Sequence, residues 1–195
     1  TTDGAAGRLT TAIQASHELT IEAWIRPIEI HQGGPARIVS LSVDPSHRNF
    51  TLGQNKTRYD FRLRTTKTDE NGTPSTEEQE NSAKTELTHL LVSRSADGIV
   101  RMFVDGKQVA TNQVVGDFSN WKDDFHLSLA NEVTGDGEWL GELYLVAIFG
   151  RALSDQEIEQ NYRAGVPRTV DYHAILPPAH SGAIDFARDI QPILR

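Results

Sequence analysis

Apolar and polar residues alternate with a period of two along most of the chain. Between residues 58 and 64, apolar side chains at 59, 61 and 63 alternate with charged side chains at 58, 60, 62 and 64. Successive side chains of a β-strand point to opposite faces, so this segment is predicted to be a strand with one buried and one polar face. Similar patterns predict further strands at 18–26, 37–43, 49–53, 88–94, 99–104, 108–111, 125–130 and 140–149.

Turn signals separate these short strands. Asp105-Gly106 lies between two of them, and this dipeptide favours the positive φ angles of a hairpin turn. One helix is predicted before the C-terminal tail, because Ser154 and Glu157 form a capping box and Gly165 ends the segment. Many strands with a single helix predict an all-β sandwich or barrel rather than βαβ units.

Two segments show no strand pattern. Residues 67–86 are almost wholly polar, and their six acidic residues against two lysines give −4, half of the chain's net charge of −8. This composition predicts a solvated loop. Residues 166–183 contain three prolines and Gly182 and are predicted to be a linker.

Composition narrows the function classes. With 195 residues, 37% of them hydrophobic, and a mean hydropathy of −0.44, the chain is typical of a globular domain. No apolar run reaches the roughly 20 residues of a membrane span. The net charge of −8 argues against nucleic acid as a partner. The absence of cysteine excludes disulfides, thiolate metal sites and a cysteine nucleophile.

The sequence lacks a catalytic constellation. The acidic clusters at 77–80 and 123–124 lie in predicted loops, without the alternate spacing on a strand that places an acid and a nucleophile in one cleft. A hydrolase of this fold would need two carboxyl groups about 5–10 Å apart. The chain also has no nucleophile elbow, no phosphate loop and no His-Glu-x-x-His pair, and its seven histidines are scattered. We therefore predict that the domain is not an enzyme.

Four residues are candidate ligand contacts. Arg62 and Arg64 project from one side of a predicted strand, where guanidinium groups can hold carboxylate, sulfate or sugar hydroxyls. The alternative is that they pair with acids across a solvent-facing sheet. Trp139 lies beside a turn-rich stretch that includes Asn131, and its ring is either a platform for a sugar or part of the packing.

The oxygen-rich loop at 131–138 is a candidate calcium site. Glu132 and Asp136 are the residues we expect to ligate the ion, together with backbone carbonyls. The spacing is not that of an EF-hand, so the prediction rests on the density of oxygen ligands alone.

Short motifs in a fixed order resemble a known family. They include a Thr-Ile-Glu-Ala-Trp strand, a Val-Asp-Gly-Lys hairpin and Arg-Ala-Leu-Ser before the last helix, within the stretches Ala6–Pro27, Ile99–Val109, Leu129–Val133 and Leu140–Gly165. Over residues 1–165 these look like a laminin-G-like, concanavalin A-like jelly roll. More narrowly, 36–54, 59–66 and 116–121 resemble the version in secreted proteins of planctomycete-type bacteria. One departure is Leu143-Tyr144-Leu145-Val146, where many relatives carry Ile-Asp-x-Val.

The resemblance implies a two-sheet antiparallel jelly-roll sandwich that binds glycans, proteins or calcium without catalysis. The leading hypothesis is a binding module of a larger secreted or periplasmic protein, which recognises a polysaccharide or a protein surface through its loops and one sheet face. The alternative is a structural or interaction domain that supports a fused c-type cytochrome module or a surface assembly.

The C-terminal residues 184–195 add a second resemblance. The sequence IDFARDIQPIL is similar to the opening of planctomycete-type cytochrome c domains, in which Cys-x-x-Cys-His follows and attaches a haem. The resemblance implies a cytochrome c domain after Arg195 in the parent chain. The alternative is that these residues form an ordinary amphipathic helix that packs on the sandwich. No haem is expected within residues 1–195, because they contain no cysteine.

Overall fold

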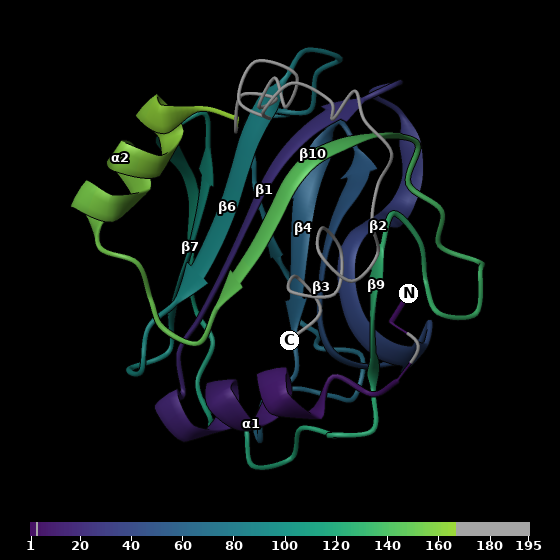
Figure 1. Cartoon of the computed structure of the whole chain (residues 1–195), viewed down its shortest axis with the longest axis vertical. Helices are drawn as coiled ribbons and strands as arrows, with labels where there is room; N and C mark the ends of the chain where they lie inside the picture. The colour runs from purple at the N-terminus through teal and green to yellow at the C-terminus, as the bar shows by residue number, and fades with distance from the viewer. Residues whose placement is uncertain (3, 167–195) are drawn as a thin grey trace, which may run out of the picture.

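The computed structural model describes residues 1–2 and 4–166, which form two antiparallel sheets packed face to face (Figure 1). The segment 184–195 and nearly all of the predicted linker lie outside the described residues. Among those that are described, no helix combines the length and the apolar character that crossing a bilayer requires.

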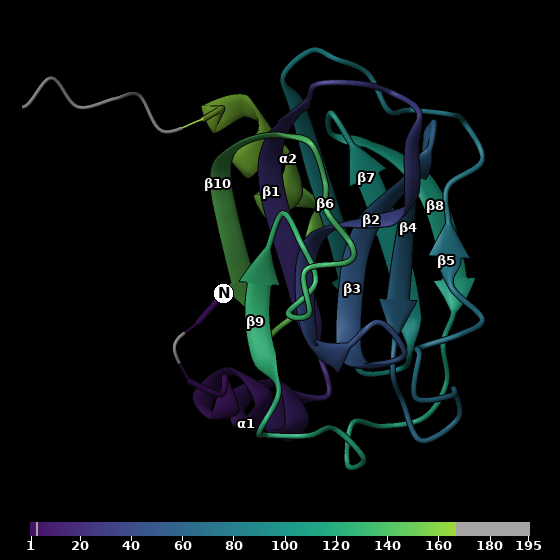
Figure 2. The same cartoon turned by 90° about the vertical axis from the view of Figure 1, so that its right-hand side faces the viewer.

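Each sheet has five strands. Sheet A has the order β10 (Gly141–Phe149), β1 (Leu19–Pro27), β6 (Thr88–Arg94), β7 (Ile99–Val104) and β8 (Lys107–Gln113). Sheet B has the order β5 (Thr76–Glu77), β4 (Arg58–Leu63), β3 (His47–Lys56), β2 (Gln32–Asp44) and β9 (His126–Leu129). In Figure 2, β9 and β10 lie at one edge of the sandwich, and β5 and β8 lie at the other.

The alternating apolar and polar residues of the sequence lie on opposite faces of each sheet. Tyr59, Phe61 and Leu63 are buried in the core between the sheets, as predicted, and Arg58, Asp60 and Arg62 lie on the outer face of sheet B. The other predicted strands are all present. The two-sheet sandwich and its antiparallel pairing are therefore confirmed.

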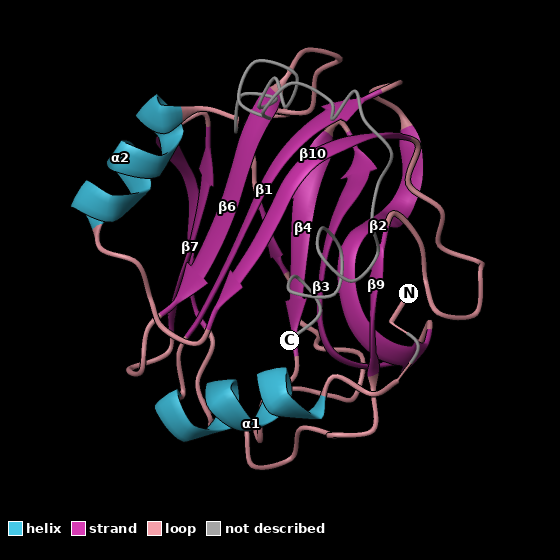
Figure 3. Ribbon diagram, viewed as in Figure 1, coloured by secondary structure: helices cyan, strands magenta, loops and turns pink. Residues whose placement is uncertain are grey.

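An N-terminal helix, α1 (Gly7–Ser16), is present, although the sequence pattern does not predict a helix there. Ile13 and Thr10 are buried, and Gln14 Nε2 donates to the Phe118 carbonyl (3.0 Å). The helix lies across one end of the sandwich (Figure 3). No side chain caps Ala6 at its start, and only Ile13 among its apolar residues is fully enclosed. This is why the usual start signal and apolar stripe are missing from the sequence.

The predicted helix near the C-terminus is confirmed as α2 (Asp155–Ala164). Ser154 accepts from the Glu157 N–H, while the Glu157 carboxylate accepts from the Ser154 N–H (2.9 Å), so both halves of the capping box are formed. Ile158 and Leu153 pack on Leu91 and Phe103, which places α2 on the outer face of sheet A.

The capping box of α2 should make the stability difference between the wild type and a Glu157 variant depend on pH. The Arg151 guanidinium, followed by the Ser154 N–H and hydroxyl, lowers the pKa of Glu157 to about 2. The folded pKa lies below the unfolded value of about 4.3, so this stabilisation is present above pH about 4.3 and is lost as the pH falls through 2. Thermal melts should show Glu157→Gln below the wild type at pH 7 and equal to it near pH 2. A gap that stays constant over this range would contradict the assignment.

Candidate functional site

The outer face of sheet B carries a row of polar side chains. Ser40 on β2, Thr51 on β3 and Arg62 on β4 are cross-strand neighbours, and Ser128 on β9 continues the row. Each occupies the outward position of its strand, because the alternate positions fill the core. Ser40 and Thr51 share a hydrogen bond between their hydroxyls (2.7 Å).

Beside this row lies a buried charged network, which we call the Glu132 cluster: Arg37, Ser42, Arg48 and Glu132. The Glu132 carboxylate accepts hydrogen bonds from Ser42 Oγ and from Arg37 Nε (3.2 Å), and Arg48 Nη1 lies 4.0 Å away. Burial, followed by the neighbouring charge of Arg37, lowers the pKa of Arg48 to about 10, while Glu132 opposes this shift. The side chains of Arg48 and Glu132 have no exposed area, so this cluster is a structural network.

Arg62 lies at the rim of the same face. Its Nε donates to Asp60 Oδ2 (3.3 Å), its Nη1 donates to Asn71 Oδ1 (3.1 Å), and its side chain is 21% exposed. Burial raises the pKa of Asp60, against the hydrogen bonds from Ser75 and Arg62. Of the two predicted arginines, Arg62 therefore keeps an accessible edge in addition to its ion pair.

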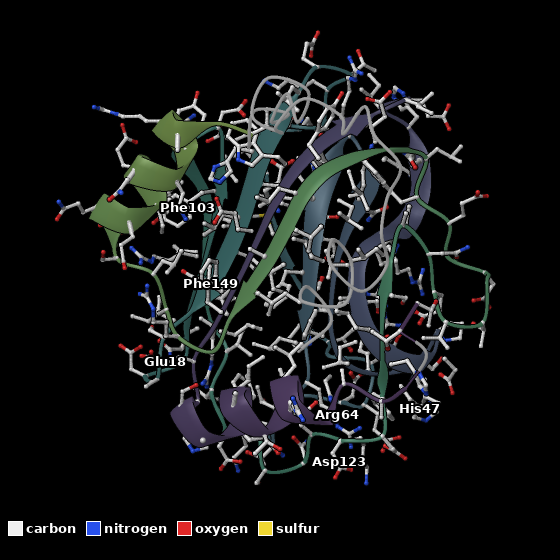
Figure 4. All side chains as sticks on the ribbon, in the orientation of Figure 1. Glu18, His47, Arg64, Phe103, Asp123 and Phe149 are labelled. Carbon is white, nitrogen blue, oxygen red and sulfur yellow. The ribbon has the colours of Figure 1, made fainter. Side chains whose placement is uncertain are left out.

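The other predicted contacts do not gather around Arg62. Arg64 is buried towards the α1 end of the molecule (Figure 4), where its Nη2 donates to Glu70 Oε1 (3.4 Å). Asn131 Oδ1 accepts from the N–H groups of Glu132 (2.8 Å) and Gly137 (3.1 Å), which closes its loop.

Trp139 belongs to the core. Its side chain is 2% exposed, and its Nε1 donates to Gln54 Oε1 (2.9 Å). A ring enclosed in this way cannot stack on a sugar. Of the two interpretations of Trp139, the structure supports packing in the core and not a platform for a sugar.

The predicted calcium ligands have different surroundings. Glu132 is enclosed by Arg37 and Ser42, whereas Asp136 is exposed and accepts from Thr134 Oγ1 (2.6 Å). In the part of the chain that the structure describes, no group of three or more His, Cys, Asp or Glu side chains could hold a metal ion. The calcium site stays a prediction.

A polar hollow opens at the β3–β4 hairpin. Its volume is about 320 Å³, and we call it the hairpin hollow; it is lined by Asn55, Lys56, Thr57, Arg58, Glu77 and Asn81. Glu77 accepts from Asn55 Nδ2 (2.9 Å) and from Arg58 Nη1 (3.3 Å). Asn81 Oδ1 accepts from Thr57 Oγ1 (2.7 Å) and Arg58 Nε (3.1 Å).

These bonds hold the lining groups in fixed orientations and leave others free. Arg58 Nη2, Asn81 Nδ2, Lys56 Nζ and Asn55 Oδ1 have no partner among the described side chains. Two of these groups, on Arg58 and Lys56, are positively charged. Donors and acceptors held at fixed angles in this way are suited to hydroxyl groups on a rigid ring. Sequence reasoning missed this site, because Glu77 and Asn81 belong to the segment predicted to be a plain loop.

Residues 2–159 match the family model described as the concanavalin A-like lectin/glucanases superfamily, of the laminin G type. The chain belongs to this superfamily. No curated protein sequence matches it.

Solved structures agree on the fold of this superfamily member. The carbohydrate-binding module CBM40 of the Ruminococcus gnavus IT-sialidase, bound to α2,3-sialyllactose, aligns with a TM-score of 0.59 and 15% identity, over 80% of this chain and 89% of the module. The botulinum neurotoxin serotype C1 binding domain aligns with a TM-score of 0.53 and 16% identity, over 75% of this chain. The matched region spans only 36% of that neurotoxin domain.

Proposed function

We propose that this domain is a non-catalytic carbohydrate-binding module of a larger extracytoplasmic protein, and that the hairpin hollow holds a sugar ring. The observation that carries the proposal is the set of unpartnered donors and acceptors around Arg58 and Asn81. The structural likeness to a complete sialyllactose-binding module supports it.

Sugar hydroxyls match the chemistry of this hollow. Adjacent hydroxyls can accept from Arg58 Nη2 and Asn81 Nδ2 and donate to Asn55 Oδ1, without displacing the bonds that position these groups. A hexose has about 12 non-hydrogen atoms, and about 0.3 kcal/mol for each gives roughly 4 kcal/mol, or a Kd of about 1 mM. None of the described residues that line the hollow is aromatic, so stacking adds nothing to this value.

Replacing Arg58 with alanine should weaken glycan binding at least about tenfold, because hydrogen bonds from a charged group are worth about 1.5–3 kcal/mol. A glycan array with neutral and acidic oligosaccharides identifies the ligand, and a titration then compares the variants. Arg163→Ala is the matched control, since Arg163 is exposed on α2 and pairs with Glu159 (2.6 Å). Silence across both sets of glycans, or equal affinity in the Arg58→Ala variant, would count against the proposal.

A structural or interaction role remains the second proposal, and an exposed apolar patch favours it. Ile28 and Leu140 are 68% and 41% exposed and are neighbours, since the Ile28 N–H donates to the Leu140 carbonyl (3.0 Å). A protein partner could cover such a patch. Sedimentation of the parent protein with and without Ile28→Asp tests this role, since loss of an assembly would support it and no change would oppose it.

The wider setting is also part of the proposal. Residues 184–195 favour a fused cytochrome c module and a secreted or periplasmic location, as their sequence resemblance implies.

Calcium bound at Glu132 and Asp136 would raise the melting temperature of the domain above its value in the presence of a chelator. An unchanged melting temperature would exclude the calcium site.

A further inference from the structure

The free groups of the hairpin hollow are mostly donors, and most of these donors are charged. Of the four free groups described above, Lys56 Nζ, Arg58 Nη2 and Asn81 Nδ2 donate, and only Asn55 Oδ1 accepts. The hydroxyls of a neutral sugar can satisfy these donors, but they bring no counter-charge to the two cationic ones.

The carboxylate of the hollow already has its partners. Glu77 Oε1 accepts from Asn55 Nδ2 (2.9 Å), and Glu77 Oε2 accepts from Arg58 Nη1 (3.3 Å). This ion pair offsets the charge of Arg58. Lys56, by contrast, forms no ion pair within the described part of the chain, and its side chain is exposed. The positive charge that lacks a counter-charge in the hollow is therefore that of Lys56.

The acidic residues that follow Glu77 in the sequence are also engaged elsewhere. The buried Glu78 carboxylate accepts from the N–H groups of Tyr59 (3.3 Å) and Ser82 (2.8 Å), and Glu80 pairs with Lys107 Nζ (2.6 Å). Charges farther away than about 8 Å are largely screened at physiological ionic strength. The chain's net charge of −8 therefore does not prevent an anion from binding beside Lys56.

The backbone at Lys56 supports a role for its side chain. Lys56 is the last residue of β3 and has a φ of 56°, in the left-handed region that glycine and asparagine adopt more readily than lysine does. Local conformation alone would favour one of those two residues here. Conformations of this kind are concentrated at ligand sites, where the surrounding structure holds them. The lysine thus supplies a charge that the turn itself does not need.

We propose that the hairpin hollow selects an acidic sugar unit, whose carboxylate or sulfate group accepts from Arg58 Nη2 and lies beside Lys56 Nζ. This inference rests on the function proposed above and names the class of sugar. The ring hydroxyls of the same unit bond to Asn81 Nδ2 and Asn55 Oδ1. Anionic oxygens form shorter and stronger bonds with cationic donors than hydroxyl oxygens do, so the acidic group adds affinity that a neutral sugar lacks.

The test compares three probes in NMR titrations of the domain at pH 7. Methyl β-D-glucuronide carries a carboxylate, methyl β-D-glucoside is its neutral analogue, and methyl β-D-glucoside 6-sulfate carries a sulfate ester. The better of the two acidic probes should bind at least about threefold more tightly than the glucoside, the gain of an exposed ion pair. This preference should shrink when NaCl is raised from about 50 to about 500 mM. The tighter acidic probe identifies the acidic group.

The result also separates this inference from the proposed function. If the glucoside binds as tightly as both acidic probes, the hollow remains a sugar site and the selection of an acidic unit is overturned. If none of the three probes gives saturable shifts at residues 55–58, 77 and 81, both proposals fail.

Three variants assign the preference to Lys56. Lys56→Asn removes the charge and places a residue that tolerates the left-handed conformation, so the variant should fold. The ratio of acidic to neutral affinity should fall towards one in Lys56→Asn and persist in Lys56→Arg. Lys122→Gln is the matched control, because it removes an exposed lysine that does not line the hollow, and its ratio should equal that of the wild type. An undiminished ratio in folded Lys56→Asn would overturn the proposal.

Discussion

Replacing Glu132 with alanine should lower the free energy of unfolding by about 3–5 kcal/mol, the usual cost of breaking a buried ion pair. The carboxylate is fully enclosed and accepts from Ser42 and Arg37, with Arg48 4.0 Å away. Its removal leaves two guanidinium groups buried without their counter-charge. Burial and the charge of Arg37 lower the pKa of Arg48, and Glu132 opposes this shift. Without the Glu132 carboxylate, the repulsion between the two guanidinium groups is no longer offset at this position. Urea unfolding measures the change.

Asp136→Ala is the control for this experiment. Asp136 lies in the same loop, but it is exposed, and among the described residues its side chain bonds only to the Thr134 hydroxyl. A surface change of this kind should cost within about 0.5 kcal/mol. If both variants lost the same stability, the loss would belong to the loop as a whole, and the account of the Glu132 cluster would be wrong.

Replacing Trp139 with alanine should cost about 3–5 kcal/mol, the range for a large aromatic side chain in a packed core. The indole ring packs so closely on the backbone that a Cβ added at Gly141 would lie 2.1 Å from one of its carbons. The substitution also leaves Gln54 Oε1 without the indole donor. Thermal or urea unfolding, followed by far-ultraviolet circular dichroism, measures the loss.

Trp139→Phe distinguishes a packing role from a binding role. This variant keeps most of the ring volume and loses the bond to Gln54, so its cost should be clearly smaller than that of alanine. Glycan affinity should not change, because the ring faces the core. A folded Trp139→Phe variant that no longer binds glycan would show that the ring contacts the ligand after all.

The period-two pattern was sufficient to predict most of the fold. Tyr59, Phe61 and Leu63 fill the core as their alternation predicts, and Ser154 and Glu157 form the predicted capping box. Both signals are local, since they depend on residues a few positions apart. Helix α1 carries neither a capping side chain nor a wide apolar stripe, and its stability comes from docking on the end of the sandwich.

The candidate site was less predictable because it depends on contacts between distant segments. Arg62 and Glu132 were singled out from residue type, but nothing in the sequence indicates that Arg37 and Arg48 would surround Glu132. The hairpin hollow forms only when a polar segment returns past β4 and brings Asn81 to Arg58. Trp139 was ambiguous because a turn-rich neighbourhood does not reveal which way a ring faces.

Whether the hairpin hollow holds a sugar ring can be decided by a residue-resolved NMR titration with the oligosaccharide selected by the glycan array. We expect saturable shifts to concentrate at residues 55–58, 77 and 81, and we expect the Arg58→Ala variant to lose them while Arg163→Ala keeps them. Shifts that map instead to other faces of the sandwich, or that persist unchanged in Arg58→Ala, would contradict the proposed sugar site.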